Sequence, residues 1–286
     1  MLQPRTNTRL ETPALVETRR SIRDDAAMHI EAAVARASAN HLTDEVLTPT
    51  FQVLIPVRGA FAYRLGASES LLTPNHALFI HGGDVSRDRF IDSHPVEYLL
   101  ITPRLDAMPN AGAAESFVRR VRAHRAVCSA AALQRHASTL WHLSRSHADP
   151  TEIEETIAQL WAEILRLGSI DTARSSRPAS KLVREAKAII GDGRERLSLS
   201  EIAAQVGTSP AYLTHAFRQC EGMTIARYQR RLRLARALAE LPHTEDLTAL
   251  ALELGFSSHA HFSAAFRATY GETPSAFRAR MRRMLI

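Results

Sequence analysis

The chain has 286 residues, 45% of them hydrophobic and 23% charged, and a formal net charge of +6. This composition is typical of a globular protein, and the length predicts two domains, each with its own core. No stretch approaches the roughly 18–20 apolar residues of a membrane span, and the polar N-terminus lacks a signal-peptide core, so we expect a cytoplasmic protein without a membrane partner. Two cysteines, Cys128 and Cys220, are too few for a disulfide framework or a cysteine-rich metal site.

The positive charge is unevenly distributed. Residues 1–180 contain 20 basic and 20 acidic residues, whereas residues 181–286 contain 16 and 10. The excess therefore lies in the last third, as expected when one domain meets a polyanion. A basic domain can also be only a solvated surface, so charge alone leaves both interpretations open.

The first hundred residues predict strands after an initial helix. Residues 22–39 are rich in alanine and predict a helix. Four short apolar runs follow, separated by Gly, Pro and Asn turns, at residues 51–55, 60–65, 76–80 and 96–101. Short strands separated by such turns predict a small sandwich or barrel.

Helical spacing dominates the next segment, at residues 116–124, 130–147 and 152–167. In the last of these, apolar residues including Trp161 recur at steps of three and four and form one stripe. The stripe fits either core packing or a dimer seam. Residues 171–180 are small, polar and proline-containing, which indicates an interdomain linker.

An internal repeat occupies the last hundred residues. Its first copy runs from Leu199 to Tyr228 and its second from Leu247 to Phe277, at an offset of 48 residues up to the glycine and 49 after it. Each copy predicts a short helix that ends at Gly207 or Gly255, because glycine readily adopts the left-handed conformation.

A second helix follows in each copy. Ser209-Pro210 in the first copy and Ser257-Ser258 in the second predict its N-terminal cap, and pairs of apolar residues four apart fix it to the core. This is a helix-turn-helix layout, in which the second helix enters the major groove. A helical bundle without a DNA role has the same spacing; the two copies, their turn residues and the basic charge favour DNA binding.

Between the copies, Ile225 to Leu241 predicts one continuous helix about 25 Å long. A connector of this length suits two recognition helices near the ~34 Å spacing of successive major grooves. The helix is dense in arginine: Arg227, Arg230, Arg231, Arg233 and Arg236. Only one helix face can reach phosphate, so we expect about half of these arginines to have intramolecular or solvent partners instead.

Two stretches, LSLSEIAAQVGTSPAYLTHAFR at 197–218 and LGFSSHAHFSAAFRATYGETPSAFR at 254–278, resemble the AraC/XylS family of transcription regulators. The resemblance covers residues 183–283. It implies binding to double-stranded promoter DNA, usually as an activator and sometimes as a repressor, with RNA polymerase as a partner.

By that resemblance, the exposed recognition positions are Ala211, Thr214, His215 and Arg218 in the first unit, and His259, Ala260, Ser263, Ala264 and Arg267 in the second. The candidates for phosphate contact are Ser209, Arg227, Arg230, Arg231, Ser257 and Ser258. Many members of the family have a long basic residue where this chain has Ala264. We therefore expect the second unit to contribute mainly shape and phosphate contacts.

The N-terminal strands, with Arg58-Gly59-Ala60-Phe61, residues 74–79 and Ser93-His94-Pro95, more loosely resemble the cupin-like sensor domain of such regulators. The resemblance implies a small effector inside the barrel and a homodimer formed through the adjoining helices. Cupin enzymes bind metal through a His-x-His pair, and His76, His81 and His94 do not form such a pair. We therefore expect these histidines to lie at strand edges or in turns, and we expect no metal or other cofactor. No catalytic set of residues stands on a recognisable active-site turn, so we expect no enzyme.

The sequence thus predicts an α+β protein. Its parts are a cupin-like, effector-sensing β-barrel with flanking helices (1–110), a helical connector or dimerisation region (111–172), a linker (173–180) and an all-α DNA-binding domain with two helix-turn-helix units (181–286). The favoured function is an effector-controlled, sequence-specific transcription regulator. The alternatives are a constitutive regulator whose N-terminal half only dimerises, and a cupin-type enzyme with a helical appendage.

Overall fold

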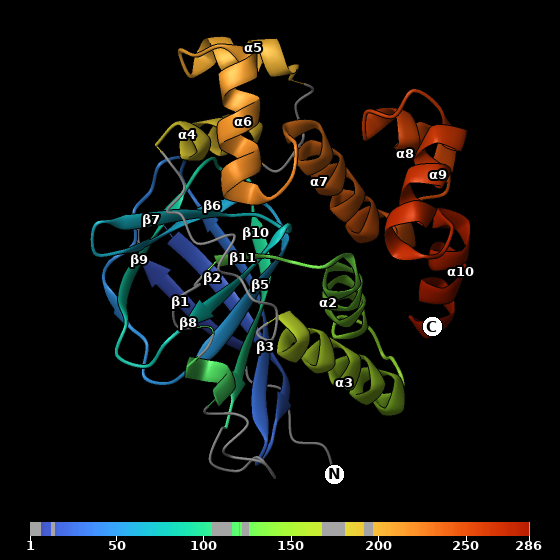
Figure 1. Cartoon of the computed structure of the whole chain (residues 1–286). Helices are drawn as coiled ribbons and strands as arrows, with labels where there is room; N and C mark the ends of the chain where they lie inside the picture. Colours follow the sequence, from blue (N-terminus) through green and yellow to red (C-terminus); the bar gives the residue numbers. More distant parts are fainter. Residues whose placement is uncertain are drawn as a thin grey trace.

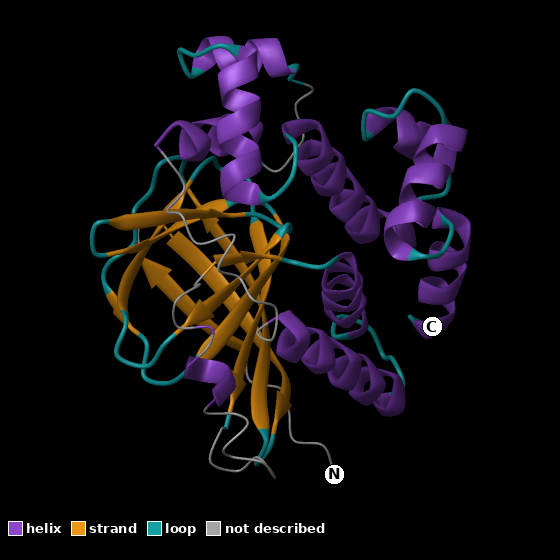
Figure 2. Cartoon of the chain, in the orientation of Figure 1, coloured by secondary structure: helices purple, strands orange, loops and turns teal. Residues whose placement is uncertain are grey.

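The computed structural model describes residues 7–12, 15–104, 116–119, 121, 126–167, 181–191 and 197–285 (Figure 1). Strands gather in the N-terminal half, and the last third of the chain is helical (Figure 2). The predicted linker at 173–180 lies outside the described residues. Among the helices of the described residues, none combines the length and the hydropathy of a membrane-spanning segment.

The N-terminal strands form two antiparallel sheets. The larger has the order β1 (Asn7–Thr12), β2 (Leu15–Asp24), β3 (Met28–Ala37), β10 (Val96–Pro103), β5 (Gln52–Arg58), β8 (His76–Ile80) and β11 (Ala126–Cys128). The smaller has the order β4 (Val46–Leu47), β9 (Val85–Phe90), β6 (Phe61–Leu65) and β7 (Ser68–Leu72). The predicted α+β class with a cupin-like sheet region is confirmed, with the refinement that the strands form two sheets and do not close into one barrel.

The helix expected over residues 22–39 is wrong, because this stretch forms the end of β2 and all of β3. β3 lies between β2 and β10 in the large sheet, and its alanines Ala32, Ala33 and Ala35 are buried. Sheet pairing on both sides outweighs the helix propensity of alanine, since β-preference depends mainly on packing against neighbouring strands. Alanine also leaves room for larger side chains beside it.

Two helices cover one face of the large sheet. α2 (Ala131–Leu143) and α3 (Pro150–Leu167) pack on Ile55, Phe79 and Leu99, among other sheet residues. Trp161 on α3 is partly buried against this same cluster, and its ring lies 6.5 Å from that of Phe117. Most of the apolar stripe of α3 therefore packs in the core of this chain, which favours the core interpretation. Of the helix predicted at 116–124, residues 116–119 and 121 are helical, and the others lie outside the described residues.

The C-terminal third confirms the predicted repeat. It contains α4 (Lys181–Ile190), α5 (Leu199–Gln205), α6 (Pro210–Glu221), α7 (Ile225–Glu240), the 3₁₀ turn η3 (Leu241–His243), α8 (Leu247–Glu253), α9 (His259–Tyr270) and α10 (Pro274–Met284). Gly207 and Gly255 turn the chain with φ of +68° and +86°. Ser209 and Ser258 cap α6 and α9 by accepting the backbone N–H of the third residue of each helix, Tyr212 and His261.

Candidate nucleic-acid interface, interior pocket and domain contact

The recognition positions of the first unit lie on the open side of α6. Leu213 and Phe217 are completely buried and fix the opposite side of the helix to the core. Ala211, His215 and Arg218 are exposed, and Thr214 is half-buried. The Thr214 hydroxyl donates to the Pro210 carbonyl oxygen at 2.8 Å, so it lies along the helix surface and not inside the core.

The second unit repeats this arrangement with α9. Phe262 and Phe266 are completely buried. The predicted positions are exposed or, for Ser263, half-buried: His259, Ala260, Ser263, Ala264 and Arg267. Figure 1 shows the two units side by side, with α5 and α6 at one end of α7 and α8 and α9 at the other. The described chain therefore presents two similar exposed helix faces joined by one continuous helix, α7.

The candidates for phosphate contact divide into two groups. Ser209, Ser257, Ser258, Arg227 and Arg230 are exposed. Arg231 instead donates to the Ser129 carbonyl oxygen of the N-terminal half, and Arg236 is buried and pairs with Glu240 and Glu253. Arg233 lies over the Phe256 ring, so three of the five arginines of this helix have intramolecular partners among the described residues, in line with the expectation of about half.

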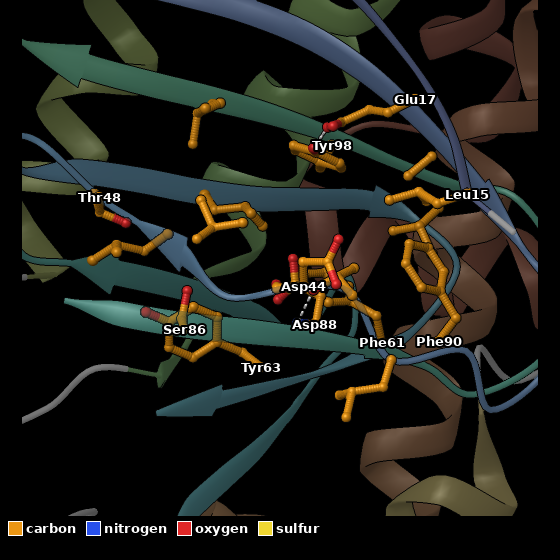
Figure 3. Close-up of a pocket in the computed structure, with 18 of the residues that line it drawn as sticks. Leu15, Glu17, Asp44, Thr48, Phe61, Tyr63, Ser86, Asp88, Phe90 and Tyr98 are labelled. Carbon is orange, nitrogen blue, oxygen red and sulfur yellow. Dashed lines mark hydrogen bonds between the residues drawn. The ribbon is translucent and has the colours of Figure 1, made fainter. Parts of the chain in front are cut away.

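A cavity of about 620 Å³ lies between the two sheets. Side chains alternate along each strand, and every second residue lines the cavity: Leu15, Glu17 and Arg19 on β2, Phe61 and Tyr63 on β6, Ser86, Asp88 and Phe90 on β9, and Val96, Tyr98 and Leu100 on β10. Figure 3 labels Asp44 and Asp88 among the residues that line this cavity, together with the aromatic side chains Phe61, Tyr63, Phe90 and Tyr98. The sequence analysis predicted an interior site in general terms but named none of these residues.

Two carboxyl groups in the cavity differ in their partners. Glu17 accepts from Arg19 Nε at 3.1 Å and from the Tyr98 hydroxyl. Asp88 is half-buried as a residue, but its Oδ1 atom is enclosed and has no hydrogen-bond partner among the described residues. Burial, followed by the nearby Glu17 carboxylate, raises the pKa of the Asp88 carboxyl to about 7.

A buried ionic cluster joins the N-terminal half to the first helix-turn-helix unit. Lys187 Nζ on α4 donates to Glu221 Oε1 on α6 at 2.9 Å, and His76 Nε2 on β8 lies 3.1 Å from both Glu221 Oε2 and Lys187 Nζ. All three side chains are at most 6% exposed. Charged residues are almost never buried unless they are paired, so this cluster is a specific contact.

The cluster continues as a chain of hydrogen bonds. The Thr73 hydroxyl lies 3.0 Å from His76 Nδ1 and 3.1 Å from the Tyr228 hydroxyl on α7. The Asn75 side chain donates to the Tyr228 carbonyl oxygen at 3.2 Å. The turn between β7 and β8 therefore docks on α6 and α7 through polar groups that partner one another.

Charge pairing sets the ionisation of the cluster. Burial opposes the charge of the Glu221 carboxylate, but the Lys187 ammonium and the His76 ring more than compensate and hold the pKa of that carboxyl well below its usual range. Burial, with the Lys187 charge beside it, lowers the pKa of the His76 ring. The cluster therefore contains a carboxylate, an ammonium and a neutral imidazole.

The second unit contacts the N-terminal half through α2. The Gln134 side chain donates to the Pro74 carbonyl oxygen at 2.8 Å and accepts from the Tyr270 hydroxyl at 3.3 Å. His142 Nε2 lies 3.2 Å from the Leu238 carbonyl oxygen, and burial lowers the pKa of its ring to about 4. A neutral ring is compatible with this contact.

The N-terminal histidines, expected at strand edges or in turns, follow that expectation only in part. His76 is the first residue of β8, as expected for a strand edge, but it is buried in the ionic cluster. His81 is also buried, next to the turn that follows β8, whereas the His94 ring is about half exposed. Among the described residues, no three His, Cys, Asp or Glu side chains are grouped so that they could bind a metal ion.

Comparisons with known proteins agree with this architecture. A helix-turn-helix domain model matches residues 202–280, and a model of the AraC-like ligand binding domain matches residues 30–161. The regulatory protein SoxS of Salmonella typhimurium is 36% identical over 86 residues, which are 30% of this chain and 80% of SoxS. The chain belongs to the AraC family of transcriptional regulators. Its helix-turn-helix match thus includes α6 and α9, and its AraC-like ligand binding match includes the cavity lining except for the residues of β2.

Two further members of the AraC family match over a smaller share of their own length. The regulatory protein PocR of Salmonella typhimurium is 31% identical over 109 residues, which are 37% of this chain and 36% of PocR. The transcriptional activator RhaR of Klebsiella pneumoniae is 39% identical over 85 residues, which are 29% of this chain and 30% of RhaR. The chain therefore matches about a third of the length of these two relatives.

Proposed function

We propose that this protein is a sequence-specific DNA-binding transcription regulator controlled by a small ligand. One observation carries the proposal: two serine-capped helices, α6 and α9, each present an exposed face in the part of the chain that contains all the excess positive charge. Polar side chains on such faces contact base edges, and flanking cations contact phosphate. The recognition residues are those predicted from the sequence, with Arg218 and Arg267 in matching positions of the two units.

The cavity supports the ligand-controlled form of this function. A constitutive regulator whose N-terminal half only dimerises has no need for an interior space. A cavity of about 620 Å³ with an apolar and aromatic lining has the size and character of a small-molecule site. We therefore favour ligand control over the constitutive alternative.

Strand β8 supplies a route from ligand to DNA. Its last residue, Ile80, lines the cavity, and its first residue, His76, belongs to the ionic cluster on α4 and α6. A ligand that shifts β8 changes the free energy of the contact with the first unit. The ligand thereby biases the placement of the recognition helices, which is a coupling free energy between two sites.

Further parts of the proposal follow from family membership. We propose that the protein acts in the cytoplasm as a homodimer on promoter DNA, that it contacts RNA polymerase as an activator, and that it catalyses no reaction of its own. These parts are tested by the oligomeric state on DNA and by transcription from the bound promoter.

The experiment is selection of duplexes from a random library by the purified full-length chain, followed by binding assays on the selected duplex and on a scrambled duplex of equal composition. We expect the selected duplex to bind at least 10³-fold more tightly, with an affinity that falls steeply as salt rises. Equal affinity for the two duplexes would overturn the proposal.

A further inference from the structure

Asp88 occupies an unusual place in the cavity wall. It lies on β9 opposite Tyr63 of β6, and its backbone is fixed by Thr43, which accepts the Asp88 N–H at 2.9 Å through its hydroxyl and donates its own N–H to the Asp88 carbonyl oxygen at 2.9 Å. The register places its side chain on the cavity side, between Ser86 and Phe90. The backbone contacts therefore hold a carboxyl group toward the cavity.

The guanidinium on the neighbouring wall has other partners. Arg19 donates to Glu17 at 3.1 Å and contacts Glu31 at 3.4 Å. Glu17 in turn accepts from Tyr98. Asp88 Oδ1 is enclosed without a partner among the described residues, which leaves an acceptor that is costly to bury and free for a ligand.

The cavity as a whole favours positive charge. Its lining includes the acidic Glu17, Asp44 and Asp88, against the single guanidinium of Arg19. The remaining wall is largely apolar and contains four aromatic rings: Phe61, Tyr63, Phe90 and Tyr98. Aromatic faces attract cations, and low-dielectric walls strengthen the field of the carboxylates.

We infer that the effector is an apolar organic cation whose protonated amine donates to Asp88 while its hydrophobic body packs on the aromatic wall. This inference rests on the proposed ligand-controlled function and names the ligand class. A charge-assisted hydrogen bond between an ammonium and a carboxylate is about twice as strong as a neutral one, and it satisfies the enclosed oxygen. A carboxylate ligand would meet net negative charge instead.

The ionisation of Asp88 fits this occupant. Burial raises the pKa of its carboxyl to about 7, and Glu17 adds to the shift. An aliphatic amine stays protonated across this range, and its charge favours loss of the Asp88 proton to solvent. The charged groups around Asp88 are Glu17 and Arg19 on β2, Asp44 in the segment before β4, and Arg87 and Arg89 beside it on β9; Tyr63, Tyr98 and His41 also line the cavity.

The test uses three compounds with one naphthalene body: 2-(1-naphthyl)ethylamine, 2-(1-naphthyl)ethanol and 1-naphthylacetate. Their dissociation constants for the purified full-length chain are measured by calorimetry at pH 8. We expect the amine to bind at least ten-fold more tightly than the alcohol, and the carboxylate to bind most weakly. Equal or stronger binding of the alcohol or carboxylate, or no binding of the amine, would overturn the inference without the use of any variant.

Variants then assign the preference to one residue. In Asp88→Asn we expect the amine to lose at least ten-fold in affinity and the alcohol to change by no more than about two-fold. Asp44→Asn is the matched control: Asp44 also lines the cavity but is exposed, so we expect the amine to lose no more than about three-fold. A loss in Asp44→Asn that equals or exceeds the loss in Asp88→Asn contradicts the assignment.

The pH dependence provides a second readout. Between pH 8 and pH 6 we expect the affinity for the amine to fall about ten-fold, because the Asp88 carboxyl takes up a proton near pH 7, while the affinity for the alcohol stays constant. A parallel change for both compounds would contradict the role of Asp88.

The ligand-binding test and the DNA-binding test of the proposed function can fail independently of each other. If the selected duplex binds specifically but the amine does not bind, the ligand class is wrong and the regulator proposal stands. If the amine binds through Asp88 but no duplex is bound specifically, the ligand class stands and the regulator proposal is wrong.

Discussion

Two regions of this molecule, the domain contact and the cavity, both contain buried charged groups, but these groups are paired in the domain contact and incompletely paired in the cavity. In the domain contact, the Lys187 ammonium and the Glu221 carboxylate are buried together, 2.9 Å apart, with His76 bridging them. In the cavity, the Asp88 carboxyl is held by its backbone but has an enclosed oxygen without a partner among the described residues. Both regions contain desolvated polar groups, but only in the domain contact does each charged group have a partner among the described residues.

This difference indicates that the domain contact stabilises the fold, whereas the cavity binds a ligand. Removal of one member of a buried pair leaves an uncompensated charge, so the domain contact is a place where single substitutions are costly. An unsatisfied buried group already carries its cost in the native state, so its removal stabilises the fold, and such groups concentrate where a ligand supplies the missing partner. The following substitutions test this contrast, from the largest expected effect to the smallest.

Lys187→Met should lower the free energy of unfolding by about 3–5 kcal/mol, because it leaves the Glu221 carboxylate buried beside a largely uncharged His76. Urea unfolding provides the measurement. Lys181→Met on the same helix is the control, with an expected effect under about 0.5 kcal/mol, since the Lys181 side chain is 83% exposed. A double variant, Lys187→Met with Glu221→Leu, should recover much of the loss; no recovery would mean that packing and not charge explains the effect.

Asp88→Asn should stabilise the protein by about 1–2 kcal/mol at pH 8, with a smaller gain at pH 5.5. The native carboxyl keeps its proton up to about pH 7, whereas the ordinary value is 3.8, so the wild type loses stability as pH rises between these two values. Thermal unfolding at the two pH values measures the gain, with the exposed Asp44→Asn as control. Destabilisation at pH 8, or an equal gain at both pH values, would show that Asp88 is already satisfied.

Tyr228→Phe should cost about 1 kcal/mol, because it removes the hydroxyl that contacts Thr73 at 3.1 Å but keeps the ring. The exposed Tyr212→Phe should have no measurable effect on stability. If β8 transmits the ligand signal through this contact, Tyr228→Phe also reduces the change that the amine produces in DNA affinity. An unchanged ligand response would place the signal outside the Thr73–Tyr228 contact.

Ser209→Ala and Ser258→Ala should each cost about 0.5–1 kcal/mol, since each removes the cap of one recognition helix. The two costs should be similar because each serine hydroxyl accepts one backbone N–H, from Tyr212 at 3.2 Å and from His261 at 3.1 Å. Ser200→Ala, at an exposed position inside α5, should have a smaller effect. Markedly unequal costs would mean that only one of the two units depends on its cap for stability.

The sequence predicted the C-terminal domain well because its signals are local. Glycines at the two turns, serines at the caps and apolar residues at steps of three and four act within about 15 residues of one another. Ser209 caps α6, Gly207 turns the chain, and Phe217 is buried, each as expected. The family resemblance predicted Thr214 and Ser263 as exposed recognition positions, and both are half-buried in the structure.

The features that the sequence missed depend on contacts between distant segments. His76, Lys187 and Glu221 meet only where the two halves dock, so no spacing in the sequence links them. The alanines of β3 indicated a helix because propensity does not include the strands on either side. In the cavity, Glu17 and Asp88 lie on strands of different sheets, so no spacing in the sequence links them.

The most direct measurement of the central claim is the affinity of Arg218→Ala and Arg267→Ala for the selected duplex, beside Arg166→Ala on α3 as a control for lost positive charge. If both helix faces bind DNA, each of the first two variants loses about ten-fold or more in affinity, and the control loses less than about two-fold. Wild-type affinity in both Arg218→Ala and Arg267→Ala would contradict the account.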